Sequence, residues 1–386
     1  MKKTAIMAGL AVAAITVSGL AGCGSTGIDK AEGAKYYALV QKDGKYGYIN
    51  ANGKETIKAE YEDAGNFTAD GLAYVKKDGK YGYIDANGEV VIQPQYEDAY
   101  SFQNGYAVVE EDGVCGVIDT TGKEVIKPQY EGIFGFGENG IAVYVDNDMY
   151  GYLSSDGTVV VTAAYTMTNP FNEDGLGIVE KVDKYGVMNE KGEEVIPFDY
   201  DYLETFSANG LALAQKDGKW GYINEKGETV IPFDYESAFT FSDNGLAAVC
   251  TDGKWGYINE KGETVVDPVY DSAYSYASNG LATVCADGKY GFIDEQGNVA
   301  VELKYSYANT FADNGLAAVN QDKSWGYINS QGEEVIPFDY DYTDTFAEPG
   351  VAIIQKDGNY GCISSTGKTV AKSKYQNIGS FVKVGE

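Results

Sequence analysis

The chain contains no histidine and no arginine. Its 386 residues include 29 basic side chains, all lysine, against 58 aspartates and glutamates, which leaves a net charge of −29. Without histidine there is no imidazole base, no histidine-activated serine or cysteine, and no histidine ligand for a metal. Without arginine there is no bidentate fork for phosphates or guanine edges, and the negative charge repels nucleic acid. We therefore expect a protein that is neither an enzyme nor a nucleic-acid binder.

Cysteine and proline are also scarce, with 5 and 8 residues. A zinc site built only from cysteine would use almost all of the thiols, so we expect no metal and no cofactor. Glycine and tyrosine, in contrast, are abundant at 49 and 33 residues. Glycine permits tight turns and aromatic residues favour strands, so this composition predicts many short strands joined by turns.

The one long apolar run lies at the N-terminus. Lys2 and Lys3 precede an apolar segment over residues 5–17, which is too short to span a bilayer and is typical of a secretory signal. The segment Leu20-Ala21-Gly22-Cys23 resembles the lipobox of bacterial lipoproteins. That resemblance implies cleavage before Cys23 and attachment of a lipid to its thiol. An ordinary signal followed by a chance cysteine is the alternative.

The chain is accordingly divided into a signal peptide (1–22), a lipidated cysteine with a small polar tether (23–35), and a folded body (36–386). The lipid would hold the body on a membrane outside the cytoplasm, at the cell surface or facing the periplasm. Cleavage removes two lysines, so the mature charge is 27 − 58 = −31. Such a body is repelled by anionic lipid headgroups, which favours a position away from the membrane surface.

A pattern with a period of 34 or 35 residues runs through the whole body. In nine of ten units an aromatic residue precedes glycine, and Cys115 replaces it in the tenth. A second glycine follows seven residues later, a tyrosine fifteen residues later, and a phenylalanine (tyrosine in one unit) six residues beyond that. The anchor residues are Tyr46, Tyr81, Cys115, Tyr150, Tyr185, Trp220, Trp255, Tyr290, Trp325 and Tyr360.

Each unit reads as three short strands. Around Trp255 the strands are expected at 245–250, 255–259 and 263–266. The Asp-Gly pair at 252–253 suits a two-residue hairpin with positive φ at both positions, and a glycine at 262 suits a bulged second turn. Pro268 is expected to end the pairing, followed by an irregular link.

Alternation along the second strand places Trp255 and Tyr257 on one face, with Gly256 and Ile258 on the other. The Ile258 column is apolar in all ten units, so we assign it to the core. The glycine column predicts a close approach of another backbone. We expect the repeated tyrosine and phenylalanine of the link to fill the seam between units, and the anchor column to be core rather than ligand surface.

This pattern resembles the WG-repeat family of bacterial proteins over about residues 36–385. The Trp-Gly pair itself occurs in three units, at 220–221, 255–256 and 325–326, while six units have Tyr-Gly. The resemblance implies an all-β tandem repeat and no particular activity.

Three short strands cannot bury a core alone, so neighbouring units must stack. An open β-hairpin superhelix and a closed β-propeller both satisfy this requirement. Ten units exceed the usual four to eight blades of a propeller. The chain also starts with a first strand and ends at Gly385, where an eleventh unit would begin, with no visible exchange between its ends. We therefore expect the open form, with the ring as the alternative.

Several candidate sites have simpler structural interpretations. Cys250 and Cys285 occupy equivalent positions and would permit a disulfide, but they, Cys115 and Cys362 are all interpreted as buried small side chains. Paired carboxylates near aromatic residues suit glycoside hydrolysis. Here they recur in three near-identical copies, at 198–201, 233–236 and 338–341, which is typical of turn residues. Segments 85–88 and 146–148 resemble fragments of calcium loops without the complete spacing.

The sequence thus predicts a non-catalytic, lipid-anchored surface that binds or scaffolds protein partners. The alternative is lectin-like binding of cell-wall or environmental polysaccharide through repeated tyrosine and tryptophan. A hydrolase that uses only carboxylates is the least favoured hypothesis, since no unit carries an insertion that would build a pocket. The ligand-binding residues remain unidentified at this level.

Overall fold

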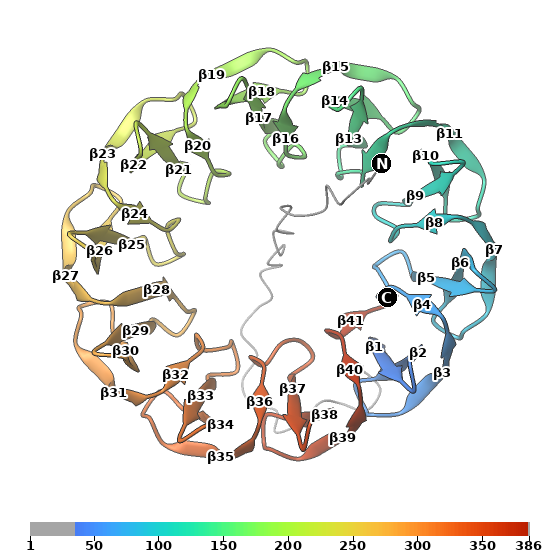
Figure 1. Ribbon diagram of the computed structural model, residues 1–386. Helices are drawn as coiled ribbons and strands as arrows, with labels where there is room; N and C mark the ends of the chain where they lie inside the picture. The colour runs from blue at the N-terminus through green and yellow to red at the C-terminus, as the bar shows by residue number, and fades with distance from the viewer. Residues whose placement is uncertain (1–34, 385–386) are drawn as a thin grey trace, which may run out of the picture.

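The computed structural model describes residues 35–384, which form a closed ring of ten β-sheets (Figure 1). We call these sheets blades 1 to 10 in chain order. Within residues 35–384 there is no helix, and hence no helix that crosses a membrane. The all-β class and the tenfold repeat predicted from the sequence are therefore confirmed.

A blade contains four antiparallel strands rather than the expected three. In blade 7 the order from the centre to the rim is β24 (Ser237–Ala238), β25 (Leu246–Thr251), β26 (Lys254–Asn259) and β27 (Thr264–Tyr270). The first of these lies inside the segment expected to be an irregular link. It is only two residues long and lacks a distinct hydrophobic period, so alternation along the sequence does not reveal it.

The remaining blades repeat this arrangement. Blade 2 consists of β4 (Asp63–Ala64), β5 (Leu72–Lys77), β6 (Lys80–Asp85) and β7 (Val90–Tyr96), and blade 3 of β8 (Asp98–Ala99), β9 (Tyr106–Glu111), β10 (Val114–Asp119) and β11 (Glu124–Tyr130). Blade 4 consists of β12 (Gly132–Phe134), β13 (Ile141–Asp146), β14 (Met149–Ser154) and β15 (Val159–Tyr165), and blade 5 of β16 (Met167–Thr168), β17 (Leu176–Lys181), β18 (Lys184–Asn189) and β19 (Glu194–Tyr200). Blade 6 consists of β20 (Tyr202–Leu203), β21 (Leu211–Lys216), β22 (Lys219–Asn224) and β23 (Thr229–Tyr235). Blades 8 to 10 consist of β28 (Ser272–Tyr276), β29 (Ala282–Ala286), β30 (Lys289–Ile293), β31 (Val299–Tyr305); β32 (Tyr307–Ala308), β33 (Ala317–Gln321), β34 (Ser324–Ile328), β35 (Glu334–Tyr340); and β36 (Tyr342–Thr343), β37 (Val351–Lys356), β38 (Asn359–Ser364), β39 (Thr369–Tyr375).

The two ends of the chain together build blade 1. Its strands β1 (Tyr36–Lys42), β2 (Lys45–Asn50) and β3 (Glu55–Tyr61) come from the N-terminal side, while β40 (Asn377–Ile378) and β41 (Val382–Lys383) come from the C-terminal side and pair with β1. The expected open superhelix is therefore wrong, and the alternative ring is correct. The segment that follows the tenth sequence unit supplies the innermost strand of blade 1. The three-strand unit recognised in the sequence begins at the second strand of a blade, so this exchange between the two ends is not visible in the sequence.

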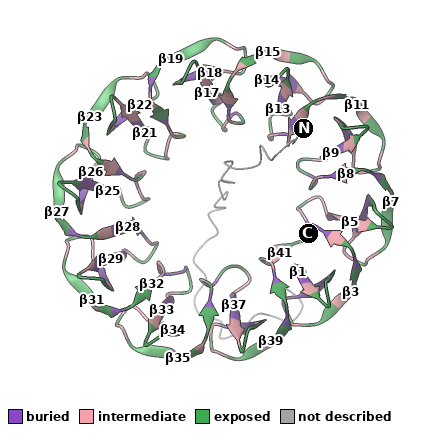
Figure 2. Cartoon of the chain, in the orientation of Figure 1, coloured by how far each residue is buried: buried purple, intermediate pink, exposed green. Residues whose placement is uncertain are grey.

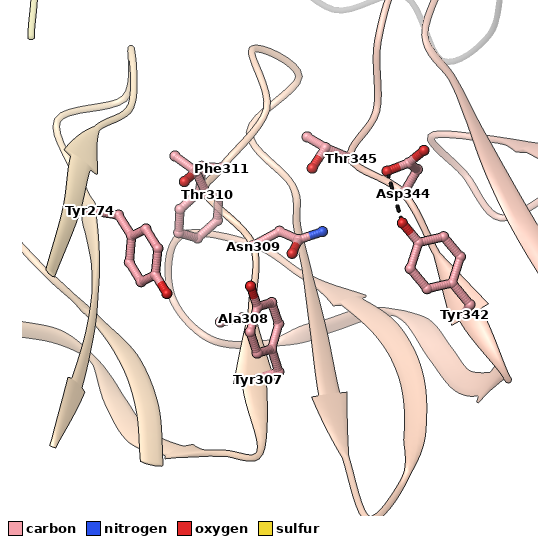
Figure 3. A pocket seen from close by; sticks show the side chains of 9 residues that line it. All are labelled: Tyr274, Tyr307, Ala308, Asn309, Thr310, Phe311, Tyr342, Asp344 and Thr345. Atoms are coloured by element: carbon pink, nitrogen blue, oxygen red, sulfur yellow. Dashed lines mark hydrogen bonds between the residues drawn. The ribbon is translucent and has the colours of Figure 1, made fainter. Parts of the chain in front are cut away.

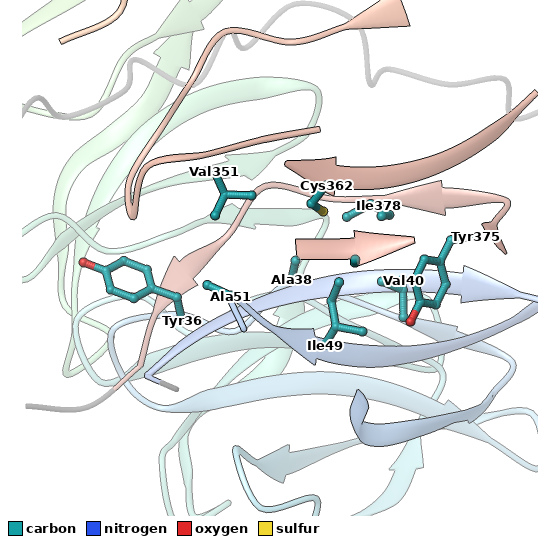
Figure 4. Packing of buried hydrophobic residues seen from close by; sticks show 10 residues of the cluster. Tyr36, Ala38, Val40, Ile49, Ala51, Val351, Cys362, Tyr375 and Ile378 are labelled. Carbon is teal, nitrogen blue, oxygen red and sulfur yellow. The ribbon is translucent and has the colours of Figure 1, made fainter. Parts of the chain in front are cut away.

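The hydrophobic core lies between blades and not within them. One cluster joins Tyr257 and Val266 of blade 7 to Val284 and Ile293 of blade 8. An equivalent cluster closes the ring, because Val40 and Ile49 of blade 1 pack with Cys362 and Tyr375 of blade 10 (Figure 4). The whole apolar column assigned to the core is buried, as predicted: Ile49, Ile84, Ile118, Leu153, Met188, Ile223, Ile258, Ile293, Ile328 and Ile363.

The glycine after the anchor accommodates a bulge in the outer strand. Trp255 pairs with Tyr270 and Tyr257 pairs with Val266, so three residues of β27 lie opposite Gly256 alone. A Cβ atom on Gly256 would overlap the Val266 carbonyl oxygen and lie 2.7 Å from the Pro268 nitrogen. The expected close approach is confirmed, and the approaching backbone belongs to the same blade.

Proline does not end the outer strand, as the sequence suggested, but lies inside its bulge. Strand β27 continues through Pro268 to Tyr270. Pro268 is one of the three residues of β27 that lie in the bulge, on the exposed rim of the ring (Figure 2), so its missing N–H group removes no ladder bond. Prolines at these positions also protect the open strand edges from pairing with other chains.

Both predicted turns are present. Asp252 and Gly253 have φ values of 51° and 71°, and Gly262 has a φ of 79°. These left-handed conformations explain why the Asp-Gly pair and the second glycine recur in the repeat.

Candidate functional site

A groove with a volume of about 390 Å³ lies on the innermost strands of blades 8, 9 and 10. Figure 3 shows Tyr274 at one end, Tyr307 and Asn309 in the middle, and Tyr342 with Asp344 at the other end. Strands β28, β32 and β36 therefore position its side chains, together with the loops that follow them. The lining residues are Tyr274, Tyr307, Ala308, Asn309, Thr310, Phe311, Tyr342, Asp344 and Thr345.

Aromatic contacts hold the exposed rings of the groove in place. Tyr307 and Tyr342 are 41% and 40% exposed. The Tyr307 ring lies 4.9 Å from Tyr290 and 5.8 Å from Trp325, measured between centroids, and Trp325 lies 5.9 Å from Tyr342. The half-buried anchor Trp325 thus stands edge-on between the two exposed tyrosines and orders both of them.

Polar groups accompany these rings. The Tyr342 hydroxyl donates a hydrogen bond of 3.3 Å to Asp344 Oδ1, and the backbone carbonyl of Asp344 accepts one of 2.6 Å from the Tyr327 hydroxyl. The backbone N–H of Asn309 donates to Ala318, whereas its side-chain amide has no hydrogen-bond partner within residues 35–384. Burial, followed by the neighbouring Tyr290, raises the pKa of Tyr274 above its ordinary value. Asp344 is the one ionisable acid or base in the lining other than the phenols.

The side chains at the groove positions vary from blade to blade. The first and third positions of the innermost strand carry Tyr307 and Asn309 in blade 9, and Tyr342 and Asp344 in blade 10. Blade 6 has Tyr202 with Glu204, but blades 7 and 8 have serine at the first position, and blade 2 has aspartate and glycine. Since constant columns build the fold, this variation marks positions that the fold does not require.

The anchor column is half-buried in eight units and buried only at Tyr81 and Cys115. The expectation that it forms core is therefore correct only in part. Trp255, for example, packs at the edge of its cluster and stacks on exposed Phe239 at 5.1 Å. The column two residues after the anchor is buried in all ten units, and it is aromatic in seven of them, including Tyr257.

This second column links successive blades. The Tyr257 hydroxyl donates 2.7 Å to the Tyr274 carbonyl of the next blade and packs against Tyr276 at 4.8 Å. The hydroxyls of Tyr48, Tyr83, Tyr152, Tyr222 and Tyr327 make the same bond 17 residues along the chain. The link aromatics do fill the seam between units, as predicted from the sequence.

The repeated carboxylates stabilise turns. Asp201 accepts 3.0 Å from the Gly218 N–H of the adjacent hairpin, and Glu236 accepts 2.9 Å from that of Gly253. The Lys184 ammonium, which bonds Asp201 at 2.5 Å, lowers the pKa of that carboxyl. In the segments 198–201 and 338–341 the first of the two acids pairs with a lysine instead: Asp199 with Lys216, and Asp339 with Lys356. Their interpretation as turn residues and surface charge is confirmed.

The cysteines and the calcium-like segments also have structural roles. The four described cysteines, Cys115, Cys250, Cys285 and Cys362, are buried free thiols, so Cys250 and Cys285 form no disulfide. Burial raises the pKa of Cys362 to about 12. Asp85 Oδ1 closes its own turn by accepting from the Asn87 and Glu89 N–H groups. Over residues 35–384 no three potential ligands gather into a metal site.

The predicted lipid-attachment residue and the groove residues remain to be compared with the sequence analysis. Cys23, the predicted lipid-attachment residue, lies outside the described residues. The groove residues were not singled out, although a signal was present: tyrosine followed two residues later by asparagine or aspartate appears at the same position in two consecutive units.

The repeat matches a known family. The WG containing repeat matches ten segments of the chain: 46–81, 81–115, 116–150, 150–185, 185–220, 220–255, 255–290, 290–324, 325–360 and 360–383. No curated protein matches the chain.

Solved structures resemble the ring at low sequence identity. A crystal structure of the eukaryotic initiation factor is 11% identical, with a TM-score of 0.49 over 78% of this chain and 94% of that one. The dihydro-heme d1 dehydrogenase NirN in complex with DHE is 14% identical, with a TM-score of 0.39 over 82% of this chain and 76% of that one. Neither likeness bears on function. The chain belongs to the family of WG containing repeat proteins, and its repeats form a closed ten-bladed β-propeller.

Proposed function

We propose that this propeller is a non-catalytic scaffold that binds protein partners and is held outside the cytoplasm by a lipid on Cys23. The observation that carries the proposal is the set of loops that follow the innermost strands and reach toward the open centre of the ring (Figure 1). We call these the inner loops. They contain carboxylates in seven of the ten blades and no lysine.

The inner loops of seven blades present negative charge toward the centre of the ring. Neighbouring loops are tied together, since Asp70 accepts 2.8 Å from the Gly105 N–H and Asp313 accepts 2.8 Å from the Ser278 hydroxyl. Glu138, Glu173 and Asp243 are exposed. With a net charge of −29, this surface favours a partner with a basic face, and electrostatic attraction would speed their encounter.

The extracytoplasmic location rests on the N-terminal sequence. The basic start, the apolar run and the lipobox-like Leu20-Ala21-Gly22-Cys23 support export and lipidation. We expect Cys23→Ala to abolish lipid attachment and to move the protein from the membrane fraction to the soluble fraction. Continued partitioning of the variant into detergent would contradict the anchor.

The binding proposal is tested with envelope proteins applied to the immobilised full-length chain. One defined basic protein should be retained at about 50 mM salt and released at about 0.5 M, because screening shortens the range of surface charge. The variant Glu138→Gln/Glu173→Gln/Asp243→Asn should retain less of it. A matched variant with three exposed rim acids changed, Glu124→Gln/Glu194→Gln/Glu334→Gln, should retain as much as the unchanged protein. Equal loss in both variants would refute a role for the inner loops.

A further inference from the structure

The groove on blades 8 to 10 has features that the inner-loop scaffold does not use. We propose that it is a binding site for a neutral oligosaccharide, with Tyr307 and Tyr342 as stacking platforms and Asn309 and Asp344 as hydrogen-bonding groups. This inference is tested separately from the proposed protein partner. Although Asn309 and Asp344 belong to the inner loops of blades 9 and 10, the tested residues differ from Glu138, Glu173 and Asp243, and so does the kind of attraction.

The two tyrosines offer flat apolar faces at a low entropic cost. Each ring is about two-fifths exposed, yet each contacts Trp325 edge-on, at 5.8 and 5.9 Å. Pyranose rings have apolar C–H faces with hydroxyls around their edge, so they match a surface that pairs aromatic faces with polar groups. Because the rings are already ordered by Trp325, little side-chain freedom would be lost on binding.

The polar groups lie beside these rings and are available. The Asn309 amide, which offers two donors and one acceptor, has no partner in the part of the chain that the structure describes. Asp344 is oriented by the Tyr342 hydroxyl, and its backbone is held by Tyr327. In Figure 3 Asn309 lies beside Tyr307, and Asp344 lies beside Tyr342.

Charge selects a neutral ligand. The lining contains Asp344 and no lysine, and the protein as a whole carries a net charge of −29. An anionic polysaccharide would therefore be repelled, and nothing in the groove would neutralise its carboxylates or sulfates. The volume of about 390 Å³, spread over three consecutive blades, suits a few sugar units of an extended chain.

The test is isothermal titration of the full-length chain in detergent with maltohexaose, cellohexaose and N-acetylchitohexaose, and with oligogalacturonate as the anionic probe. At least one neutral hexasaccharide should bind with an affinity that is unchanged between about 50 mM and 0.5 M salt, and the anionic probe should not bind. Tyr307→Ala and Tyr342→Ala should each weaken binding about 10-fold, and Asn309→Ala should weaken it as well. Phe239→Ala, which removes an equally exposed ring outside the groove, should leave the affinity unchanged.

Thermal midpoints of all variants distinguish lost binding from lost folding. Because Tyr307 and Tyr342 are exposed, both variants should melt close to the unchanged protein. The inference is overturned if none of the three neutral hexasaccharides binds, if the two tyrosine variants bind as tightly as the Phe239 control, or if oligogalacturonate occupies the groove instead. The inner-loop variant tests protein binding, and it should bind the neutral hexasaccharide as tightly as the unchanged protein. Either proposal can therefore be refuted without refuting the other.

Discussion

At the scale of single residues, the position of a phenol decides whether its hydroxyl stabilises the fold. Tyr257 and Tyr375 are both buried. The Tyr257 hydroxyl donates a hydrogen bond of 2.7 Å to the Tyr274 carbonyl of the next blade, whereas the buried Tyr375 hydroxyl has no hydrogen-bond partner among residues 35–384. Removal of a bonded hydroxyl leaves a buried acceptor unsatisfied, while removal of an unbonded one relieves a desolvation cost.

We therefore expect opposite effects from the same chemical change at these two positions. Tyr257→Phe should lower the free energy of unfolding by about 1–2 kcal/mol, and Tyr375→Phe should leave it unchanged or raise it slightly. Urea denaturation of the two variants checks this comparison. Equal destabilisation would show that the hydrogen bonds between blades contribute nothing beyond the packing of the rings.

At the scale of secondary-structure elements, two glycines of one hairpin are required for different reasons. Gly253 has a φ of 71°, but no atom of the described residues lies within 4 Å of a Cβ placed on it. Gly256 instead faces the bulge of β27, with the Pro268 nitrogen 2.7 Å from such a Cβ and the Val266 oxygen closer still. In the first case the cost of a side chain is backbone strain, and in the second it is a collision between two strands.

Alanine substitution should separate the two costs. Gly253→Ala should destabilise the protein by about 1–2 kcal/mol, the cost of a left-handed conformation. Gly256→Ala should cost about 3 kcal/mol or more, because backbone atoms of β27 must move. Thermal unfolding of both variants measures the difference, and a milder effect at Gly256 would contradict the close strand approach.

At the scale of the whole molecule, closure depends on a few residues at the C-terminal side. Two short strands, β40 and β41, complete blade 1, and Ile378 belongs to the cluster that joins blades 10 and 1. Backbone bonds from Gln376 to Gln41 at 2.9 Å and from Gly379 to Leu39 at 2.8 Å hold them there. Each of the ten blades then has two neighbours, so unfolding should be cooperative.

Deletion of residues 376–386 should open the ring. We expect a destabilisation of about 3 kcal/mol or more, since the core side chain of Ile378 and the two backbone bonds are lost together. The radius of gyration from small-angle X-ray scattering should increase. Deletion of residues 385–386 alone is the control and should change neither quantity. An unchanged radius in the longer deletion would mean that closure does not depend on β40.

The buried tyrosines around the ring also predict a pH dependence. Burial raises the pKa values of Tyr48, Tyr83, Tyr222 and Tyr257 above the ordinary value of 10. Because the folded-state pKa exceeds the unfolded one, the stability from these groups is complete below about pH 10 and is lost as the pH rises above it. The midpoint temperature of thermal unfolding should decrease as the pH is raised from about 10 to about 11.5, and tyrosinate absorbance should increase together with unfolding. Free titration of all 33 tyrosines in the folded protein would contradict this expectation.

The amino-acid sequence by itself determined the repeat, its period, the turns and the apolar column. These features are local, because strand alternation, Asp-Gly hairpins and a left-handed glycine follow from a few neighbouring residues such as Asp252, Gly253 and Ile258. The interpretation of the repeated carboxylates also followed from the sequence, since identical copies indicate a role that every blade shares.

Only the tertiary structure decided the closure of the ring and the place of the groove. The pairing of Val40 with Ile378 joins segments that are far apart in the sequence. The strand that contains Ile378 has two residues, which is too short for a hydrophobic pattern that would predict the pairing. Similarly, Tyr274, Tyr307 and Tyr342 belong to three different blades, and they line one groove only because those blades stand side by side around the ring. The energy of such contacts depends on how blades pack, a relation that no single repeat contains.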